Sequence, residues 1–423
     1  MKTNSALLTV SALAAVTAVA LSGCSKSDEG SARAASSGPA TAKLDTGSYR
    51  TTPQPDFGKA GSPAMGAIIE GQRMAEFVIH PFDIDINLTK VGMMGTYVIK
   101  NSAALGAILA KPIPDSIRND NFVTGFSTAA GEVGDVGHST VHAVLRFADP
   151  ASAAKAAQDL HQSILTTDLN DPTINPPTPT SPPNVGTEAQ IPGLPDTLAV
   201  SHDYFGKYSV DALTVHGPYV LYDWFQGNDG SELAATKDWA NKSVARSVKL
   251  QTPKIDAFPA TDPAKLADLP IDVDGVLRLT LPTKLGQTST SQQAVYGPSG
   301  FLHFSGSPVQ DQLLLQQSGT DRIAIGASTV YRTRDDKGAQ VLLDGFGKQF
   351  SKTMHVGPAP VGVPGAKCWV GNGNMSDSQT TCLLARGRFV AQINATDVQN
   401  KGTDLTQAQQ MAAAQYEVLA GQK

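Results

Sequence analysis

The chain has 423 residues, with 33 Lys or Arg side chains and 38 Asp or Glu side chains, and its formal net charge is −5. This small acidic excess is spread along the sequence. It argues against nucleic-acid binding, which needs a basic patch, and against adhesion to a membrane through a polybasic segment. A chain of this length exceeds what one hydrophobic core usually serves, so two or three domains are expected.

The first 24 residues fall into three parts. Lys2 supplies positive charge, and the apolar run from Leu7 to Leu21 covers about fifteen residues, which suits a signal peptide and is short for a membrane span. The run ends in Leu21-Ser22-Gly23-Cys24, which looks like a bacterial lipobox. We therefore expect residues 1–23 to be a lipoprotein signal peptide, and acyl chains on Cys24 to anchor the protein to the cell membrane on the extracytoplasmic side, in the cell envelope.

Residues 24–60 are rich in Ser, Gly, Ala and Pro, which predicts a flexible tether. The alternative for the segment before it is a buried helix with an ordinary thiol, but such a helix would not lead into so polar a tract. A second proline-rich stretch, at residues 253–270, is the predicted linker. The predicted domains are therefore an N-terminal α+β domain at residues 61–252 and a C-terminal α+β domain at residues 271–423.

Two cysteines remain besides Cys24. In an exported protein, Cys368 and Cys382 are expected to form a disulfide, which would close a loop of about fifteen residues and add roughly 3 kcal/mol of stability. A redox-active pair or two free thiols are the alternatives. The spacing is not that of a CxxC motif, and no histidine cluster accompanies the pair to complete a zinc site.

The predicted domains repeat one order of elements: a strand, a helix, two or three strands and a closing helix. Gly217-Pro218-Tyr219-Val220 in the first copy matches Gly387-Arg388-Phe389-Val390 in the second. In the first copy these elements cover residues 139–147, 150–165, 197–204, 209–216, 219–226 and 231–250. In the second copy they cover residues 322–332, 338–350, 367–370, 381–385, 388–395 and 404–420.

This β-α-β-β-α order predicts an α+β fold: two similar domains, each with an antiparallel sheet and helices packed on one face. The order is common, so the short sequence matches also have a chance explanation. Each copy has a lead-in. Before the first copy we expect helices at 63–78 and 103–110 and a strand at 82–88. Before the second we expect strands at 276–281 and 300–304 and a helix at 309–317.

The lipobox and tether, the run Val295-Tyr296-Gly297-Pro298-Ser299-Gly300, and the block from Cys368 to the Gln410–Tyr416 helix resemble an uncharacterised family of mycobacterial and nocardial envelope lipoproteins. The resemblance covers most of the chain after the signal. It implies a two-domain lipoprotein with a disulfide in its C-terminal domain, and it brings no ligand or reaction with it.

Motifs that identify a reaction are missing. There is no G-x-S-x-G nucleophile elbow, no P-loop, no G-x-G-x-x-G and no H-E-x-x-H sequence. A catalytic triad assembled from distant residues stays open, because triads are defined by geometry and not by sequence order. No catalytic residue and no cofactor are predicted.

Two segments resemble metal sites without meeting the requirements. His138 and His142 share one face of a predicted strand, but four strand residues separate their Cα atoms by roughly 13 Å, too far for one ion. Asp83-Ile84-Asp85-Ile86-Asn87 begins like a calcium loop, yet Leu88 and Met94 occupy the positions that need Gly and Glu. We interpret this segment as a half-buried strand and predict no metal site.

The densest aromatic cluster is at residues 219–225. Tyr222 and Trp224 are expected on one face of a strand, and Tyr219 and Phe225 on the other. Such side chains suit either a hydrophobic core or a binding platform for a glycan or lipid, and we favour the core.

Taken together, the sequence favours an exported, lipid-anchored envelope protein that acts as a non-catalytic module. Its expected partners are the membrane, through the anchor, and a lipid, a glycan or another envelope protein, with no nucleic acid; the oligomeric state is open. The alternative is a hydrolase that modifies the cell wall or lipids through an unfamiliar site. Two similar domains also suggest a ligand cleft between them.

Overall fold

The computed structural model describes residues 44–133, 137–174, 182–204, 207–227, 233–283, 293–371, 379–396 and 404–422. Cys24, the predicted signal peptide and the first part of the predicted tether lie outside these ranges. A search of the described residues finds no helix with the length and apolar character needed to cross a membrane.

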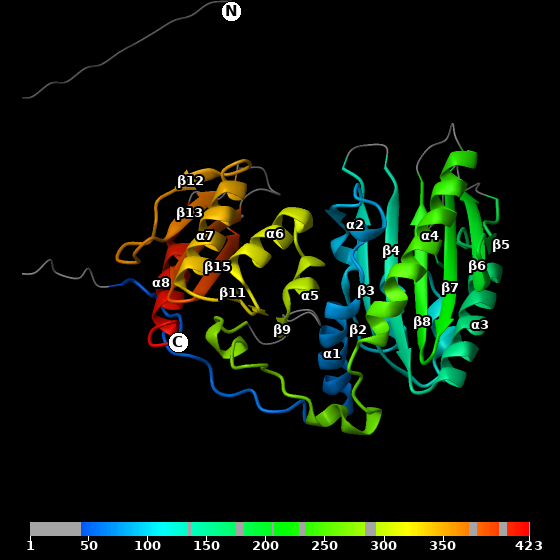
Figure 1. Ribbon diagram of the computed structural model, residues 1–423, viewed down its shortest axis with the longest axis horizontal. Helices are drawn as coiled ribbons and strands as arrows, with labels where there is room; N and C mark the ends of the chain where they lie inside the picture. Colours follow the sequence, from blue (N-terminus) through cyan, green and yellow to red (C-terminus); the bar gives the residue numbers. More distant parts are fainter. Residues whose placement is uncertain are drawn as a thin grey trace, which may run out of the picture. The chain divides into compact units, whose positions relative to one another are not determined.

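The first sheet is antiparallel and has eight strands in the order β1-β3-β4-β8-β7-β6-β5, with β2 also pairing β3 (Figure 1). Its strands are β1 (Lys90–Val91), β2 (Tyr97–Ile99), β3 (Phe122–Gly131), β4 (Ser139–Phe147), β5 (Thr187–Ile191), β6 (Leu194–Tyr204), β7 (Lys207–His216) and β8 (Tyr219–Gln226).

The second sheet is also antiparallel and has seven strands in the order β12-β13-β14-β15-β11-β10-β9. Its strands are β9 (Ala294–Tyr296), β10 (Arg322–Ile325), β11 (Ser328–Arg332), β12 (His355–Gly357), β13 (Lys367–Val370), β14 (Gln379–Arg386) and β15 (Phe389–Thr396).

The helices of the molecule are α1 (Pro63–Met74), α2 (Pro81–Ile84), α3 (Pro150–Thr166), α4 (Leu233–Asp256), α5 (Pro298–Leu302), α6 (Pro308–Ser318), α7 (Asp336–Phe350) and α8 (Thr406–Val418). Two of them start with a capping aspartate whose side chain accepts a hydrogen bond from the third residue of the helix: Asp149 before α3 and Asp335 before α7.

The two sheets share one topology. β3-β4-β8-β7-β6-β5 corresponds strand by strand to β10-β11-β15-β14-β13-β12, with α3 matching α7 and α4 matching α8. The turns β7–β8 and β14–β15 each contain a glycine with positive φ, Gly217 at 54° and Gly387 at 56°. A side chain rarely adopts that conformation, so both copies need glycine at this point. The predicted α+β fold with two similar antiparallel domains is confirmed.

The helices do not share one face of each sheet, which corrects that part of the prediction. Along β8, Leu221 joins a buried cluster with Val244 of α4, whereas Val220 joins another with Leu160 of α3. In the second domain, α7 packs with Leu383 and α8 packs on the other face (Figure 1). The central strands are buried almost continuously because both of their faces are covered.

All three predicted lead-in strands are wrong. Two of these segments overlap short helices that begin at a proline. Pro81 and Pro298 each occupy a first helical position, where a proline is favourable, so residues 82–84 lie in α2 and residues 300–302 lie in α5. Residues 276–281 contain a short 3-10 turn, Leu277–Leu279. The helix expected at 103–110 is a 3-10 helix, Ser102–Ala107, and α1 and α6 confirm the other two lead-in helices.

The described end of the predicted tether is packed against the C-terminal domain, contrary to the expectation of a flexible coil. The side chains of Leu44, Tyr49 and Phe57 pack against a core cluster of the C-terminal domain, and the backbone N–H of Gln54 donates to the carbonyl of Arg278 at 2.8 Å. The composition of the tether predicted too little apolar surface for packing, but these three side chains are enough to attach its described end to the domain. In addition, α4 continues through Pro253 to Asp256, so the predicted linker begins inside a helix.

Candidate functional site

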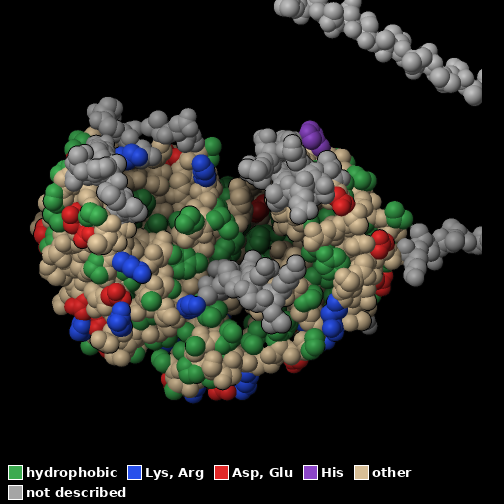
Figure 2. All heavy atoms as spheres, turned by 180° about the vertical axis from the view of Figure 1, so that it is seen from behind, with side chains coloured by type: hydrophobic (Ala, Val, Ile, Leu, Met, Phe, Trp, Pro, Cys, Tyr) green, Lys and Arg blue, Asp and Glu red, His purple; other side chains and the backbone are tan. Residues whose placement is uncertain are grey.

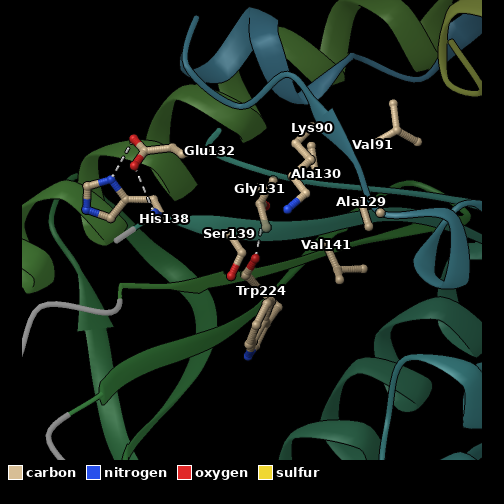
Figure 3. Close-up of a pocket in the computed structure, with 13 residues that line it drawn as sticks. Lys90, Val91, Ala129, Ala130, Gly131, Glu132, His138, Ser139, Val141 and Trp224 are labelled. Carbon is tan, nitrogen blue, oxygen red and sulfur yellow. Dashed lines mark hydrogen bonds and ion pairs between the residues drawn. The ribbon is translucent and has the colours of Figure 1, made fainter. Parts of the chain in front are cut away.

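An open hollow of about 380 Å³ lies at one end of the first sheet, where β1, β3, β4 and β8 meet (Figure 3). β1 pairs with the end of β3 and places Lys90 opposite Gly131. Trp224 of β8 lies opposite Val141 of β4 and contributes an aromatic surface. The residues around the hollow are Lys90–Gly92, Ala129–Glu132, Gly137–Val141 and Trp224.

Small side chains create this hollow. Ala129, Ala130 and Gly131 of β3 present only methyl groups or hydrogen to it. The turn after β1 lies close to β3: Gly92 N donates to the carbonyl of Ala129 at 2.8 Å, and a Cβ on Gly92 would approach the Ala129 Cβ to 2.9 Å. The size of the hollow lies within the range of about 300–1,000 Å³ that is usual for small-molecule sites.

Glu132 and His138 flank the open end of the β3–β4 hairpin (Figure 3). Nδ1 of His138 lies 3.0 Å from Oε1 of Glu132, and the backbone N–H of His138 donates to Oε2 at 3.1 Å. The imidazole stacks on the indole of Trp239, with centroids 3.7 Å apart, and the indole N–H donates to Oδ2 of Asp85 at 2.9 Å. Among the described residues, Asp85, Glu132 and His138 form the group with metal-ligand spacing.

His142, the second histidine of the predicted strand face, belongs to a separate and fully buried network. Its Nδ1 lies 2.8 Å from Oδ1 of Asp223, and its Nε2 lies 3.0 Å from Oε1 of Gln251. Ser247 Oγ donates to the same Asp223 oxygen at 2.6 Å. Gln251 also accepts from the backbone N–H of Ile79 and donates to the carbonyl of Phe77. The network ties α4 to β4, β8 and residues 77–79.

This network contains Ser, His and Asp but lacks the geometry of a hydrolytic triad. In a triad, Nε2 of the histidine receives the proton of the serine hydroxyl, and Nδ1 faces the aspartate. Here Nε2 of His142 faces Gln251, and Ser247 Oγ lies on the opposite side of the ring, 3.2 Å from Nδ1 of His142 and 2.6 Å from Oδ1 of Asp223. All of these side chains have no solvent exposure. Their arrangement is that of a buried polar cluster in a core, in which one oxygen, Oδ2 of Asp223, has no hydrogen-bond partner among the described residues.

The aromatic cluster divides as the strand alternation predicts. Tyr219 and Phe225 are buried in the core on the α4 face, and Tyr222 is buried on the α3 face. Trp224 shares the face of Tyr222 but is only half-buried and lines the hollow. Three of the four rings therefore belong to the core, and one is available to a ligand.

The two domains meet at α5, inside the run Val295–Gly300 that was singled out from the sequence. The Glu76 carboxylate accepts hydrogen bonds from the backbone N–H groups of Ser299 (3.2 Å) and Gly300 (2.7 Å). Nε2 of His80 lies 2.9 Å from the carbonyl of Ser299. The ring of His80 stacks on that of His303 at a centroid distance of 4.4 Å. The run is a contact between domains and carries no chemistry of its own.

A narrow space lies at this junction, among the described residues. The space lined by His80, Phe82, Thr128 and His303 holds about 10 Å³, which is at most the room for one water molecule. One hydrophobic cluster includes residues of both sheets, among them Val144 and Leu383. The ligand cleft expected between the copies stays a prediction, because this space alone is too small to hold a ligand.

A second open pocket, of about 590 Å³, lies on the C-terminal domain at the end of α7. Three exposed lysines, Lys348, Lys352 and Lys367, surround it together with Trp369. Lys367 Nζ lies 3.1 Å from Oδ1 of Asp344, and a hydrogen bond from Gln340 together with Lys367 and Lys348 lowers the pKa of Asp344. Lys348 and Lys352 are four residues apart, and this spacing in the sequence already indicates that the two lysines lie on one side of the chain.

The charged side chains elsewhere do not form a single-sign patch on the face shown in Figure 2, where basic and acidic groups are interspersed. The predicted disulfide is confirmed: Cys368 and Cys382 are bonded across β13 and β14, with their Cα atoms 4.1 Å apart. Cys382 and Ala212 lie the same number of residues before the turn glycines of their sheets, so they occupy equivalent positions. Ala212 pairs with Ala199 in the first domain, as Cys382 pairs with Cys368 in the second.

These features define a two-domain α+β protein with a duplicated sheet, an open hollow on the first domain and a disulfide in the second. Residues 57–271 match the N-terminal model of the domain of unknown function DUF7373, and residues 276–422 match its C-terminal model. The chain belongs to this family.

Comparison with curated proteins finds no match. Among solved structures, the chain is similar to the extracellular domain of PknH from Mycobacterium tuberculosis at 14% sequence identity. The match covers 42% of this chain and 96% of that one, with a TM-score of 0.27. A TM-score this low supports no inference about fold or function.

Proposed function

We propose that this protein is an exported envelope lipoprotein, anchored through Cys24, and that it acts as a non-catalytic module binding a small polar ligand in the hollow of its first domain. The lipobox at Leu21–Cys24 supports the anchor. The Cys368–Cys382 disulfide supports an oxidising, extracytoplasmic location, because disulfides persist mainly outside the cytoplasm.

The observation that carries the binding proposal is the composition of the hollow. Trp224 offers a flat aromatic surface, and Lys90 and Ser139 add hydrogen-bonding groups around it. An aromatic face beside several polar groups suits a sugar ring, which has apolar C–H faces and a polar edge. A glycan unit of the envelope is therefore the proposed ligand class, in preference to a lipid tail, which would need a more apolar lining.

Native mass spectrometry of the protein, released by detergent from its own membranes, tests this proposal. We expect a bound mass of glycan type on the wild-type protein and its loss in Trp224→Ala and Lys90→Glu. Lys207→Glu, a charge reversal at an exposed lysine on β7, is the matched control and should retain the bound mass. A wild-type protein without any bound mass, or equal losses in the control, would contradict the proposal.

A further inference from the structure

The geometry points to a metal site formed by Asp85, Glu132 and His138 at the rim of the hollow. We propose that these side chains bind one divalent transition-metal ion, with Zn²⁺ as the best fit. One ligand atom from each residue lies within 4.8 Å of the other two. One imidazole nitrogen with two carboxylate oxygens is a donor set that Zn²⁺ accepts, with a further position left for water or a ligand.

The distance between two of the ligands already suits an ion. Nδ1 of His138 and Oε1 of Glu132 are 3.0 Å apart. Two ligands that each lie about 2.0–2.1 Å from a Zn²⁺ ion are separated by roughly 3.0–3.4 Å, so an ion can take the place of the proton that the two atoms share. Asp85 then has to move by about an ångström or two, within reach of a side-chain adjustment.

Trp239 holds two of the three ligands in position. Its ring stacks on His138 with an interplanar angle of 18°, and its N–H donates to Oδ2 of Asp85. Its other neighbour, Phe225, belongs to the core and meets the indole edge-on at 5.6 Å. Hydrogen bonds of this kind, from residues outside the ligand set, fix the orientation of ligands in metal sites. A surface ion pair has no need of such support.

The hairpin fixes the other ligand pair. The backbone N–H of Glu132 donates to the carbonyl of His138 at 2.9 Å, so the two residues face each other just beyond the last paired residues of β3 and β4, Gly131 and Ser139. Their side chains are 19% and 24% exposed. They are sheltered enough to favour an ion over bulk water, yet open enough for it to enter.

Charge also favours an ion here. Two carboxylates with a neutral imidazole carry a charge of about −2, which a divalent cation balances. Several other histidines of the first domain pair with one carboxylate; two examples are His161 with Glu188 at 3.1 Å and His216 with Asp256 at 2.6 Å. Among the described residues, neither pair has a third group at ligand spacing. The His161–Glu188 and His216–Asp256 pairs therefore serve as controls for the metal-binding test.

The test is Zn²⁺ binding to the untagged, lipid-free chain from Ser25 onward, after removal of metal with a chelator. Isothermal titration calorimetry and elemental analysis after dialysis should give one Zn²⁺ per chain. Co²⁺ in place of Zn²⁺ should give visible absorption and quench the fluorescence of Trp239. Asp85→Asn, Glu132→Gln and His138→Gln should each weaken binding by at least the 10- to 100-fold that loss of a supporting hydrogen bond costs in known sites.

His161→Gln should bind Zn²⁺ like the wild type. Asp85→Asn keeps an oxygen for the Trp239 hydrogen bond, and urea unfolding of each variant verifies that it is folded. Failure of the wild type to bind Zn²⁺ more tightly than His138→Gln would overturn the proposal, as would tight binding that survives all three substitutions. Trp224→Ala, which removes the proposed ligand surface, should leave Zn²⁺ binding unchanged, so this test is independent of the ligand proposal.

Discussion

Gln251 connects three partners in the first domain. Its side chain accepts from the backbone N–H of Ile79 at 2.9 Å, donates to the carbonyl of Phe77 at 2.8 Å and faces Nε2 of His142. No solvent reaches it. A buried donor or acceptor without a partner costs about 1–3 kcal/mol, so this one amide prevents several such losses.

We predict that Gln251→Leu lowers the free energy of unfolding by about 2–4 kcal/mol, because it leaves three buried polar groups without a partner. Urea unfolding followed by circular dichroism measures this. Gln162→Leu, on the exposed side of α3, is the control and should change stability by less than about 0.5 kcal/mol. Equal midpoints for the two variants would contradict this view of the network.

His303 makes the domain contact sensitive to acid. Its Nδ1 lies 3.0 Å from Oγ1 of Thr128 and its Nε2 lies 3.0 Å from the carbonyl of Ala75. Burial, followed by the charge of His80, lowers the pKa of His303 well below its usual value. An unfolded histidine titrates near pH 6.5, so below that pH the unfolded chain binds a proton that the folded chain refuses.

Stability should therefore be complete above about pH 6.5 and fall as the pH decreases toward the folded-state pKa of His303, by at most about 1.4 kcal/mol per pH unit for this proton. His303→Gln removes this contribution. We predict that the loss of unfolding free energy between pH 7.5 and pH 5.0 is about 1–2 kcal/mol smaller in the variant than in the wild type. The same loss in both proteins would show that His303 has no part in it.

At the scale of elements, the junction between domains depends on glycines in the segment that leads into α5. A Cβ on Gly297 would approach Oε2 of Glu76 to 2.5 Å and displace the carboxylate that accepts from Ser299 and Gly300. We predict that Gly297→Ala costs about 1–3 kcal/mol in the free energy of unfolding. Gly306→Ala is the control, since no atom lies within 4 Å of a Cβ there. A Gly297→Ala protein as stable as this control would contradict the proposed contact.

The disulfide occupies a position that the first domain fills with two alanines. The double variant Cys368→Ala/Cys382→Ala reproduces the pair Ala199–Ala212 of the other sheet. We predict that the C-terminal domain still folds but loses about 3 kcal/mol, the cost of freeing a loop of this length in the unfolded chain. Thermal unfolding of the oxidised and variant proteins measures this, and an unfolded variant would contradict the assigned equivalence of the two sheets.

The sequence predicted the repeated elements because hydrophobic alternation and turn glycines are local signals. It did not predict α2, because the alternation of Phe82, Ile84 and Ile86 suggests a strand, while Pro81 and Asp83 provide a helical start. The helices on both faces were missed because the strands were assigned from alternation, whereas the near-continuous apolar run of β8 is typical of a strand covered on both sides.

The candidate sites were less accessible to sequence reasoning. Trp224 and His138 were singled out, but their neighbours at the hollow come from β1 and β3, which carried no motif. Asp85 and Trp239 are far apart in the chain and meet only because α2 and α4 pack beside the β3–β4 hairpin. Spacing in the sequence excludes a metal shared by His138 and His142, but it cannot exclude ligands brought together by the fold.

At the scale of the whole molecule, the protein is a duplicated α+β body whose two domains share a hydrophobic core at their junction. The hollow lies on the first domain and the lysine pocket on the second. The family match covers both domains and fits this organisation. The proposed anchor at Cys24 determines the compartment in which the protein can bind a ligand. The proposed function therefore rests on export and lipidation.

The most direct test of that claim is the intact mass of the protein extracted from the membranes of its own cells. We predict a chain that begins at Cys24 and carries two or three acyl chains, and a Cys24→Ala form that keeps its signal segment and carries no lipid. Recovery of the wild-type chain without lipid, in the soluble fraction, would contradict the account.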